Sequence, residues 1–278
     1  MSLSVNTNIG ALIALQNLNT TNGQMSAVQN HIDTGLKVAG AKDNSAVYAI
    51  AQNARGTTGA LDAIKQGVSR GSSIVDIAVS AGETISDLLV QMKQKAVAAD
   101  DPSLDPASRA ALNEDFHALI QQISSVKQNA TFDGANLIDG SLPNGLVVLA
   151  DASAQNTITI GTESMSLGGA LISLTANQDV LSQANASIAL AQVDASTKAV
   201  NAALARLGSA GKKLDQHLTF LGKLQDAFTN AIGNMVDADM AKESAQLQAL
   251  QVKQQLGVQA LSIANSQPQL LLSLFRNG

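Results

Sequence analysis

A heptad repeat that runs from Val193 to Ala238 constrains the fold of this chain more than any other feature. Every seventh residue is apolar, at positions Val193, Val200, Leu207, Leu214, Leu221, Phe228 and Met235. The companion positions three residues further on are mostly alanine. Apolar residues at an average spacing of 3.5 mark a long helix that packs lengthwise against other helices. At about 1.5 Å per residue this helix spans on the order of 65 Å, so the repeat predicts an elongated body.

Two shorter helical seams can supply partners for that helix. The first runs over residues 61–99 and ends at Asp101-Pro102, because a proline disfavours helical geometry in the residue before it. The second begins at Asp105-Pro106, where an acid that can cap the helix precedes a proline at the first helical position. Their seam positions are Val68, Val75, Ile85, Leu89, Met92, Leu112, Phe116, Leu119 and Ile123. The three helices predict a mostly α fold, an antiparallel helical bundle or coiled coil.

The residue pattern changes between about 130 and 178. Residues 131–134 have the composition of a turn, and residues 146–150 and 157–160 have that of short strands. The segment between the strands, residues 151–156, fits a hairpin loop. We expect the rest of this segment to form surface turns and loops. The sequence therefore predicts a small β-hairpin insert between the helices.

Both ends of the chain carry an apolar stripe on a polar, nearly uncharged background. The stripe residues are Leu12, Leu15, Leu18, Met25, Ile32, Leu250, Leu256, Leu261, Leu271 and Phe275. Asn and Thr are mediocre helix formers, so we expect the first end helix to be weakly stable alone. Residues 35–44 read as an irregular link, and Pro268 is expected to interrupt the last helix. Apolar ends favour association, so we expect these helices to pair with each other and with neighbouring molecules.

Composition excludes several classes of function. The net charge of -5 gives no attraction to nucleic acid, and no apolar run is long enough for membrane insertion. The chain has no Cys, which excludes thiolate metal sites, and its three His residues lie far apart. Asp237 and Asp239 are interpreted as a polar link rather than a cation site. We therefore expect no catalytic, cofactor-binding or metal site, and no enzyme activity.

Five segments resemble signatures of the bacterial flagellins. At the N-terminal side these are Ser-Val-Asn-Thr-Asn at 4–8 and Ala-Lys-Asp-Asn-Ser-Ala at 41–46. At the C-terminal side they are the segments 237–244 (DADMAKES) and 255–265 (QLGVQALSIAN). Phe-Asp-Gly at 132–134 is similar to a Phe-Asn-Gly turn of that family. Because only residues 127–192 separate the long seams, the chain is most similar to short alphaproteobacterial flagellins without outer variable domains.

The resemblance implies a structural subunit that polymerises into the bacterial flagellar filament for swimming motility. It implies an inner domain from residues 1–44 and 237–278, and an outer helical domain over 45–236 with the β insert near 130–178. Heterologous contacts between copies of the chain, or of paralogous flagellins, build an open helical polymer. The implied location is extracellular, after secretion by the flagellar type III export apparatus without a cleaved signal peptide. An export chaperone, a filament cap and hook-junction proteins are the implied further partners.

The resemblance also bears on recognition by the innate flagellin receptor of animals. Recognised flagellins carry an arginine-rich stretch that ends in Glu-Leu-Ala-Val. By similarity, the corresponding residues of this chain are Gln91, Lys95, Ala96 and Val97. Asp115 stands where those proteins carry a glutamate. The loss of one arginine and one leucine implies weak or no receptor recognition.

Two other functions fit parts of the pattern. A hook-filament junction protein of the flagellum shares similar ends but is expected to match less well along residues 61–99 and 193–238. An amphipathic lipid-surface coat protein would also carry apolar stripes. The strict heptads, and a polar face without a Lys/Arg bias, count against the coat protein.

Overall fold

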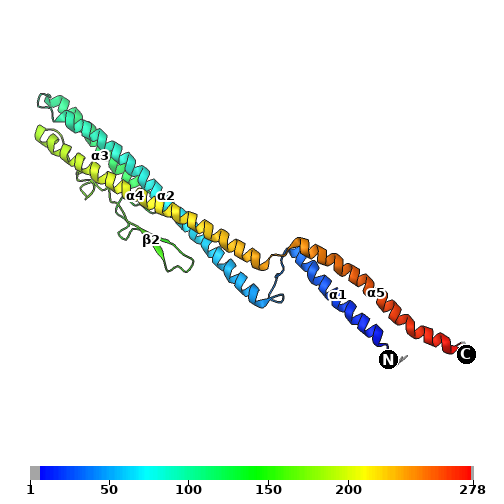
Figure 1. Cartoon of the computed structure of the whole chain (residues 1–278). Coiled ribbons are helices and arrows are strands. Elements are labelled where there is room, and N and C mark those ends of the chain that lie inside the picture. The colour runs from blue at the N-terminus through cyan, green and yellow to red at the C-terminus, as the bar shows by residue number, and fades with distance from the viewer. Residues whose placement is uncertain (1–6, 277–278) are drawn as a thin grey trace. The chain divides into compact units, whose positions relative to one another are not determined.

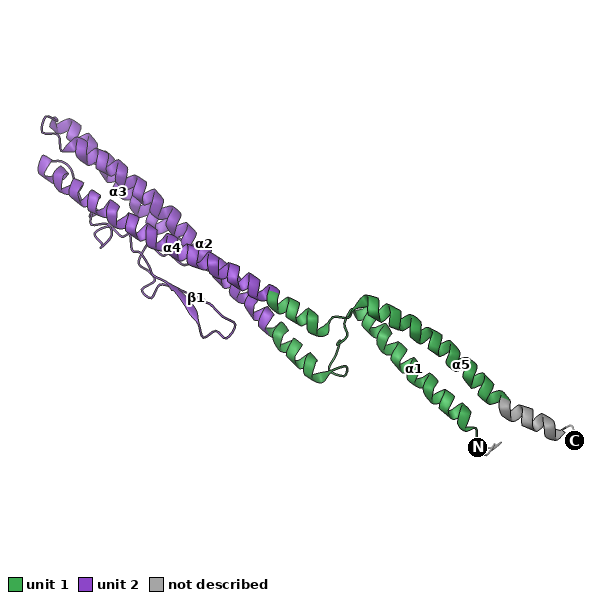
Figure 2. Cartoon of the chain, in the orientation of Figure 1, with its two compact units in different colours: residues 1–56, 227–278 green, residues 57–226 purple. Residues whose placement is uncertain are grey.

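The computed structural model describes the backbone of residues 7–276 and the side chains of residues 7–266. In chain order the elements are α1 (Ile9–Thr34), α2 (Ser45–Ala99), α3 (Pro106–Asn129), β1 (Leu146–Leu149), β2 (Thr157–Ile160), α4 (Gln183–Val236) and α5 (Met240–Arg276), as labelled in Figure 1. The predicted mostly α fold with a small β-hairpin is confirmed. The chain divides into two compact units, residues 1–56 with 227–278 and residues 57–226 (Figure 2). Each unit is described separately.

The unit of residues 57–226 is a bundle of α2, α3 and α4 around an aliphatic core. Phe116 is the one aromatic side chain among its fully buried residues, because the seams are filled by Leu, Ile, Val, Met and Ala. The predicted seam positions that are buried are Val68, Val75, Ile85, Leu89, Met92, Phe116, Ile123, Val193, Val200, Leu207, Leu214 and Leu221. Leu112 and Leu119 are half-buried at the edge of α3.

The join between α2 and α3 follows from the side chains at their ends. Asp105 caps α3 by accepting hydrogen bonds from the backbone N–H groups of Ala107 (2.9 Å) and Ser108 (3.0 Å). The Ser108 hydroxyl also donates to Asp105, and this bond is the main reason that the pKa of Asp105 lies below its ordinary value. At the end of α2, Arg109 Nε donates to the Ala99 carbonyl at 2.9 Å. These bonds satisfy backbone groups that the helix ends leave without a partner.

The β-hairpin lies where the sequence predicts it. Its strands are antiparallel, with Leu146 opposite Ile160 and Leu149 opposite Thr157. The strands reach α2 at Gly71, where an added Cβ would lie 2.9 Å from a methyl group of Val148. A larger residue at this position would therefore push the hairpin away from the bundle.

The rest of the insert corrects the expectation of surface loops. Met165, Ile172 and Leu174 are fully buried, although they lie in irregular structure. Gly82 of α2 makes room for one of them, because an added Cβ would lie 3.1 Å from Met165 Cε and 2.7 Å from Leu204 Cδ2. Isolated apolar residues in irregular structure have no period, so periodicity cannot detect them.

The helix boundaries differ from the sequence expectation in two places. The α2 helix begins at Ser45 rather than near residue 61, because Asn44 Oδ1 caps it by accepting from Val47 N–H at 3.1 Å. Its first turns lack a regular apolar stripe because most of their side chains are exposed. The α5 helix continues through Pro268 to Arg276, so the predicted interruption is wrong. The fixed φ of proline is compatible with a helix, and the missing N–H leaves the carbonyl of residue 264 without its helical donor.

The candidate assembly surface of the terminal helices

In the other unit, α1 and α5 lie side by side as an antiparallel pair (Figure 1). Three cross-helix contacts set the direction, from Asn8 to Ala264, from Asn22 to Gln254 and from His31 to Glu243. The inward stripe of α1 is Ala11, Ala14, Leu18, Thr21, Met25, Val28 and Ile32. The inward stripe of α5 is Glu243, Leu247, Leu250, Gln254, Gly257, Leu261 and Ala264. Both stripes alternate steps of three and four residues, which is the spacing of a coiled-coil seam.

This pair covers only part of its apolar surface. Val28 and Leu250 are its buried apolar residues among the described side chains. Three predicted packing residues point outward, since Leu12 and Leu256 are each 58% exposed and Leu15 is also exposed. The remaining predicted residues with described side chains are Leu18, Met25, Ile32 and Leu261, all half-buried. The side chains of Leu271 and Phe275 lie outside the described residues.

The outward face holds further apolar residues beyond the predicted packing residues. They are Ile9, Ile13, Val252, Val258 and Ile263, all of them exposed. These residues fall outside the heptad stripes, so a search for one periodic seam passes over them. With Leu12, Leu15 and Leu256 they make an exposed apolar surface on each helix, away from the shared seam, and we term the two surfaces together the outward apolar face of the pair.

Charge is nearly absent from the same helices. Residues 7–30 contain no charged side chain, and Lys253 is the one charged residue between 244 and 266. The polar positions are Asn, Gln, Ser and Thr. Burying this face against another apolar surface therefore removes few ions from water, which avoids the main cost of desolvation.

The His31–Glu243 contact is the charged exception. His31 Nδ1 lies 3.4 Å from Glu243 Oε1, and the two side chains are 25% and 13% exposed. Glu243 Oε2 and His31 Nδ1 have no hydrogen-bond partner. The pair lies at the end of the seam where α1 ends and α5 begins, and it forms an ion pair only when His31 is protonated.

Two links, residues 35–44 after α1 and residues 237–239 before α5, meet beside a small apolar cluster. Its buried residues are Val38, Ala51 and Val236. The partly buried residues packed against them are Leu36, Val47, Tyr48, Ile232 and Met235. Of the last two predicted seam residues, Met235 contacts this cluster, and Phe228 is half-buried on α4.

Backbone pairing holds the same crossing together. Leu36 pairs with Asp237, Lys37 N–H donates to the Val236 carbonyl at 2.8 Å, and Ala238 N–H donates to the Gly35 carbonyl at 2.8 Å. Asp239 caps α5 by accepting from Ala241 N–H at 3.0 Å. Asp239 therefore has a structural partner of its own.

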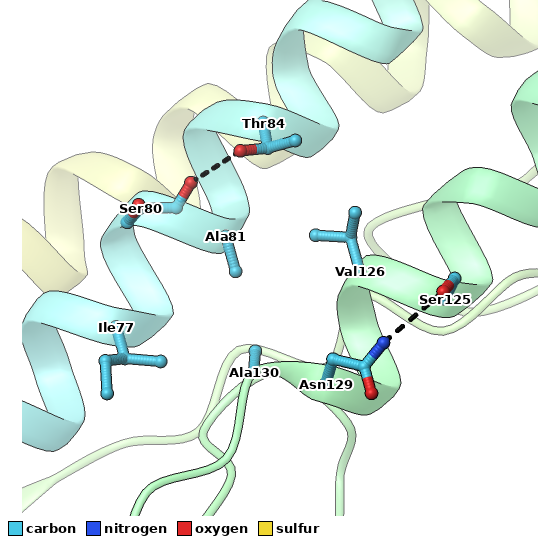
Figure 3. A pocket seen from close by; sticks show the side chains of 8 residues that line it. All are labelled: Ile77, Ser80, Ala81, Thr84, Ser125, Val126, Asn129 and Ala130. Atoms are coloured by element: carbon cyan, nitrogen blue, oxygen red, sulfur yellow. Dashed lines mark hydrogen bonds between the residues drawn. The ribbon is translucent and has the colours of Figure 1, made fainter.

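One groove of the bundle is lined by apolar, hydroxyl and amide side chains. The groove in Figure 3 lies between α2 and the end of α3 and has a volume of about 330 Å³. Its lining residues are Ile77, Ser80, Ala81, Thr84, Ser125, Val126, Asn129 and Ala130, without an ionisable side chain. Over the described residues, no group of three or more His, Asp or Glu side chains is placed to hold a metal ion. Likewise, none of the described helices has the length and apolar content that crossing a membrane requires.

The structure also places the residues that the sequence analysis aligned with the stretch carried by recognised flagellins. Lys95 Nζ lies 2.6 Å from Asp115 Oδ2, so the two helices α2 and α3 are joined there by an ion pair. Ala96 is buried in the bundle, whereas Gln91 and Val97 are exposed. Only part of the stretch is therefore available to a partner that approaches α2 from outside.

Comparison with known proteins identifies the family. The family model for the bacterial flagellin N-terminal helical region matches residues 5–142, and that for the C-terminal helical region matches residues 190–275. Flagellin FljJ of Caulobacter vibrioides is 50% identical over 280 residues, which cover 100% of each chain. A flagellin of Brucella melitensis is 35% identical over 281 residues, covering 98% of this chain and 99% of the relative.

A solved structure from Vibrio parahaemolyticus, assigned to the flagellar hook-associated class, shares the fold alone. It has a TM-score of 0.59 at 14% identity and covers 70% of this chain and 100% of that one. The two family matches include α1, α2 and α3 and most of α4 and α5, the helices that carry the apolar seams. The chain belongs to the bacterial flagellin family, the structural subunits of the flagellar filament.

Proposed function

We propose that the outward apolar face of α1 and α5 forms the contact between neighbouring copies in the filament. The observation that carries this proposal is a set of eight exposed large apolar side chains on two helices with almost no charge. Exposed apolar patches of this kind mark interaction surfaces. In this proposal residues 1–44 and 237–278 form the inner layer of the filament, and residues 45–236 form the outer layer.

The energetics favour folding of the ends together with assembly. Burying one leucine contributes about 1.5–3 kcal/mol, whereas ordering each backbone residue costs about 1–2 kcal/mol. A two-helix pair that buries only one face gains too little from its own contacts to offset that cost. Neighbouring copies cover the outward sides of the two helices and supply the remaining burial. The contact is heterologous, which gives an open helical polymer.

The same marginal stability suits secretion. Weakly folded ends allow the chain to pass through the flagellar type III export apparatus, kept from premature association by an export chaperone. No cleaved signal peptide is required on this route. Subunits then add beneath a filament cap, above the hook-junction proteins, and the product is an extracellular filament without enzymatic activity. Paralogous flagellins with the same face can enter the same polymer.

We further propose weak or no recognition by the innate flagellin receptor. Gln91 takes the place of an arginine, and Lys95, which pairs with Asp115, takes the place of a leucine. A receptor that binds this stretch therefore loses a cationic contact at Gln91 and a large apolar contact at Lys95. A reporter-cell assay with the depolymerised chain tests this, and potency equal to that of a recognised flagellin would overturn it.

Seeded growth tests the assembly surface directly. Leu12→Gln combined with Leu256→Gln keeps good helix formers at both positions but removes the apolar contact. We expect this double variant to lose elongation from parent filament seeds, followed by sedimentation and electron microscopy. The matched control is Ile188→Gln, which changes a similarly exposed apolar residue of α4, 54% exposed, outside the proposed face. Equal elongation by the double variant and the control would reject the proposed face.

The same experiment separates the two alternative functions. A hook-filament junction protein has the fold that the Vibrio structure shares with this chain, but it is expected to stop at a short cap-like assembly. An amphipathic lipid-surface coat protein would leave solution for lipid droplets instead of elongating seeds. Long filaments from purified chain would therefore exclude both.

A further inference from the structure

A single side chain, that of Asn8, holds the start of α1 and the backbone of α5 together. Its Oδ1 accepts a hydrogen bond from the Ala11 N–H at 3.0 Å, which caps α1. Its Nδ2 donates to the carbonyl of Ala264 in α5 at 2.6 Å. The Asn8 side chain therefore uses both ends of its amide: the oxygen accepts in the cap, and the nitrogen donates across to α5.

The carbonyl of Ala264 is available because of Pro268. In a regular α-helix the carbonyl of residue 264 accepts from the N–H of residue 268. The backbone of α5 is helical through residue 268, but proline has no N–H to donate. Proline is the least favourable residue within a helix, so it is expected there only where something else depends on it. Here the unmatched carbonyl is the acceptor that Asn8 uses.

Two further contacts along the seam depend on the same alignment. Gln254 Nε2 donates to Asn22 Oδ1 at 2.7 Å. Leu18 packs over Gly257, where an added Cβ would lie only 3.3 Å from Leu18 Cδ1. A slide of one heptad would break all of these contacts. It would still oppose five of the seven stripe residues of each helix, so the apolar residues alone specify the alignment weakly.

We propose that Asn8 and Pro268 are positioning residues that fix the register of α1 against α5, supported by the Asn22–Gln254 and Leu18–Gly257 contacts. This inference rests on the proposed assembly surface, because the register decides which residues of the two helices line up on the outward apolar face. A second copy of the chain docks on that face only if the two helices present it in one alignment.

Disulfide formation can report the register, since the chain contains no Cys. A Cβ added at Gly10 would lie 3.9 Å from Ala264 Cβ, within the range that a disulfide needs. Gly10→Cys with Ala264→Cys is therefore the native-register reporter. Asn17→Cys with Ala264→Cys reports a slide of one heptad, which moves α1 by about 10.5 Å. The ratio of the two disulfide yields, measured on gels after mild oxidation of filaments, gives the register.

The decisive variant is Asn8→Asp, which keeps the capping oxygen and removes the donor. We expect the ratio of native to shifted disulfide to fall roughly fivefold, because one such hydrogen bond is worth about 1 kcal/mol. Asn8→Ser, a good cap too short to reach α5, should behave alike. Asn19→Asp, at an exposed position of the same helix, is the matched control and should leave the ratio unchanged.

Pro268→Ala gives the Ala264 carbonyl its helical donor back. We expect helix content to rise while the disulfide ratio falls, and we expect no further fall when Asn8→Asp is added, because the two changes act on one bond. A general loss of structure would instead lower helix content and both disulfides together. Circular dichroism on the same samples separates these results.

An unchanged ratio in Asn8→Asp would overturn the register proposal. Variants that do not polymerise alone are oxidised as a minor component of filaments grown with the parent chain. If the parent reporter chain itself forms no filament, the proposed function fails. The ratio measured in the free chain then still decides the register proposal.

Discussion

The terminal pair of α1 and α5 and the bundle of residues 57–226 use the same heptad spacing to different ends. In the bundle, three helices surround the seam, and the heptad residues from Val193 to Leu221 are buried. In the pair, two helices cover one stripe each, and Leu12 and Leu256 are left in water. The comparison indicates that a heptad pattern specifies packing but not whether the partner comes from the same chain.

Charge separates the two regions as clearly as burial does. In the bundle, an ion pair of Lys93 with Asp194 at 2.7 Å joins α2 to α4, and one of Arg206 with Glu163 at 2.5 Å joins α4 to the insert. The terminal pair carries polar amides instead, and the bond between Gln254 and Asn22 takes the place of an ion pair. Exposed ions keep a surface hydrated, whereas uncharged amides and aliphatic groups can be dehydrated at lower cost.

The largest expected effect tests the difference in burial. Phe116→Ala removes a fully buried ring from the bundle and should destabilise the free chain by about 3–5 kcal/mol. Leu12→Ala should change the stability of the free chain by less than about 0.5 kcal/mol, because the side chain is already in water. Thermal unfolding followed by circular dichroism measures both. A loss of stability in Leu12→Ala as large as in Phe116→Ala would mean that the Leu12 side chain is already buried in the free chain.

A smaller effect tests how tightly the insert packs on the bundle. Gly82→Ala places a Cβ against Leu204 and Met165, so overpacking should cost about 1–3 kcal/mol, partly offset by a gain of about 1 kcal/mol in helix propensity. Gly59→Ala on the same helix meets nothing within 4 Å and should only gain the propensity. Urea unfolding of the two variants gives the comparison. Equal stabilisation by both would show that Met165 and Leu204 move away freely.

Periodicity is what made the bundle and the hairpin predictable from sequence. The strands appear at residues 146–149 and 157–160, within a residue of the predicted positions, because they are short apolar runs between turn residues. The end of α2 before Pro102 and the cap of α3 at Asp105 could be predicted from sequence, because both depend on neighbouring residues. The start of α2 at Ser45 was not, because exposed first turns carry no stripe.

For the candidate surface, sequence reasoning found the leucines but not their arrangement. Leu12 and Leu18 have the same residue type and lie six positions apart, yet one points outward and the other packs on Gly257. Which stripe faces the partner depends on α5, more than two hundred residues away. The Asn8 bond to Ala264 was equally invisible, because no local pattern links an asparagine to a carbonyl at that separation.

The smallest expected effect concerns acid stability, and it lies in the bundle because the terminal pair has so few carboxylates. The Ser108 hydroxyl and backbone N–H groups stabilise the charged form of Asp105, so its pKa in the folded chain is below the ordinary value of 3.8. A lowered pKa in the folded chain adds stability at pH values above 3.8, and this stability is lost as the pH falls through the folded pKa.

Asp105→Asn keeps the cap, since Asn is an equally good capping residue, but it cannot titrate. The unfolding curves of parent and variant should therefore converge as the pH is lowered from 5 toward 2, measured by circular dichroism of the bundle. Curves that stay parallel over this range would place the acid sensitivity elsewhere in the bundle, with Asp101, whose pKa is lowered chiefly by its bond from the Ser103 hydroxyl, as the next carboxylate to replace.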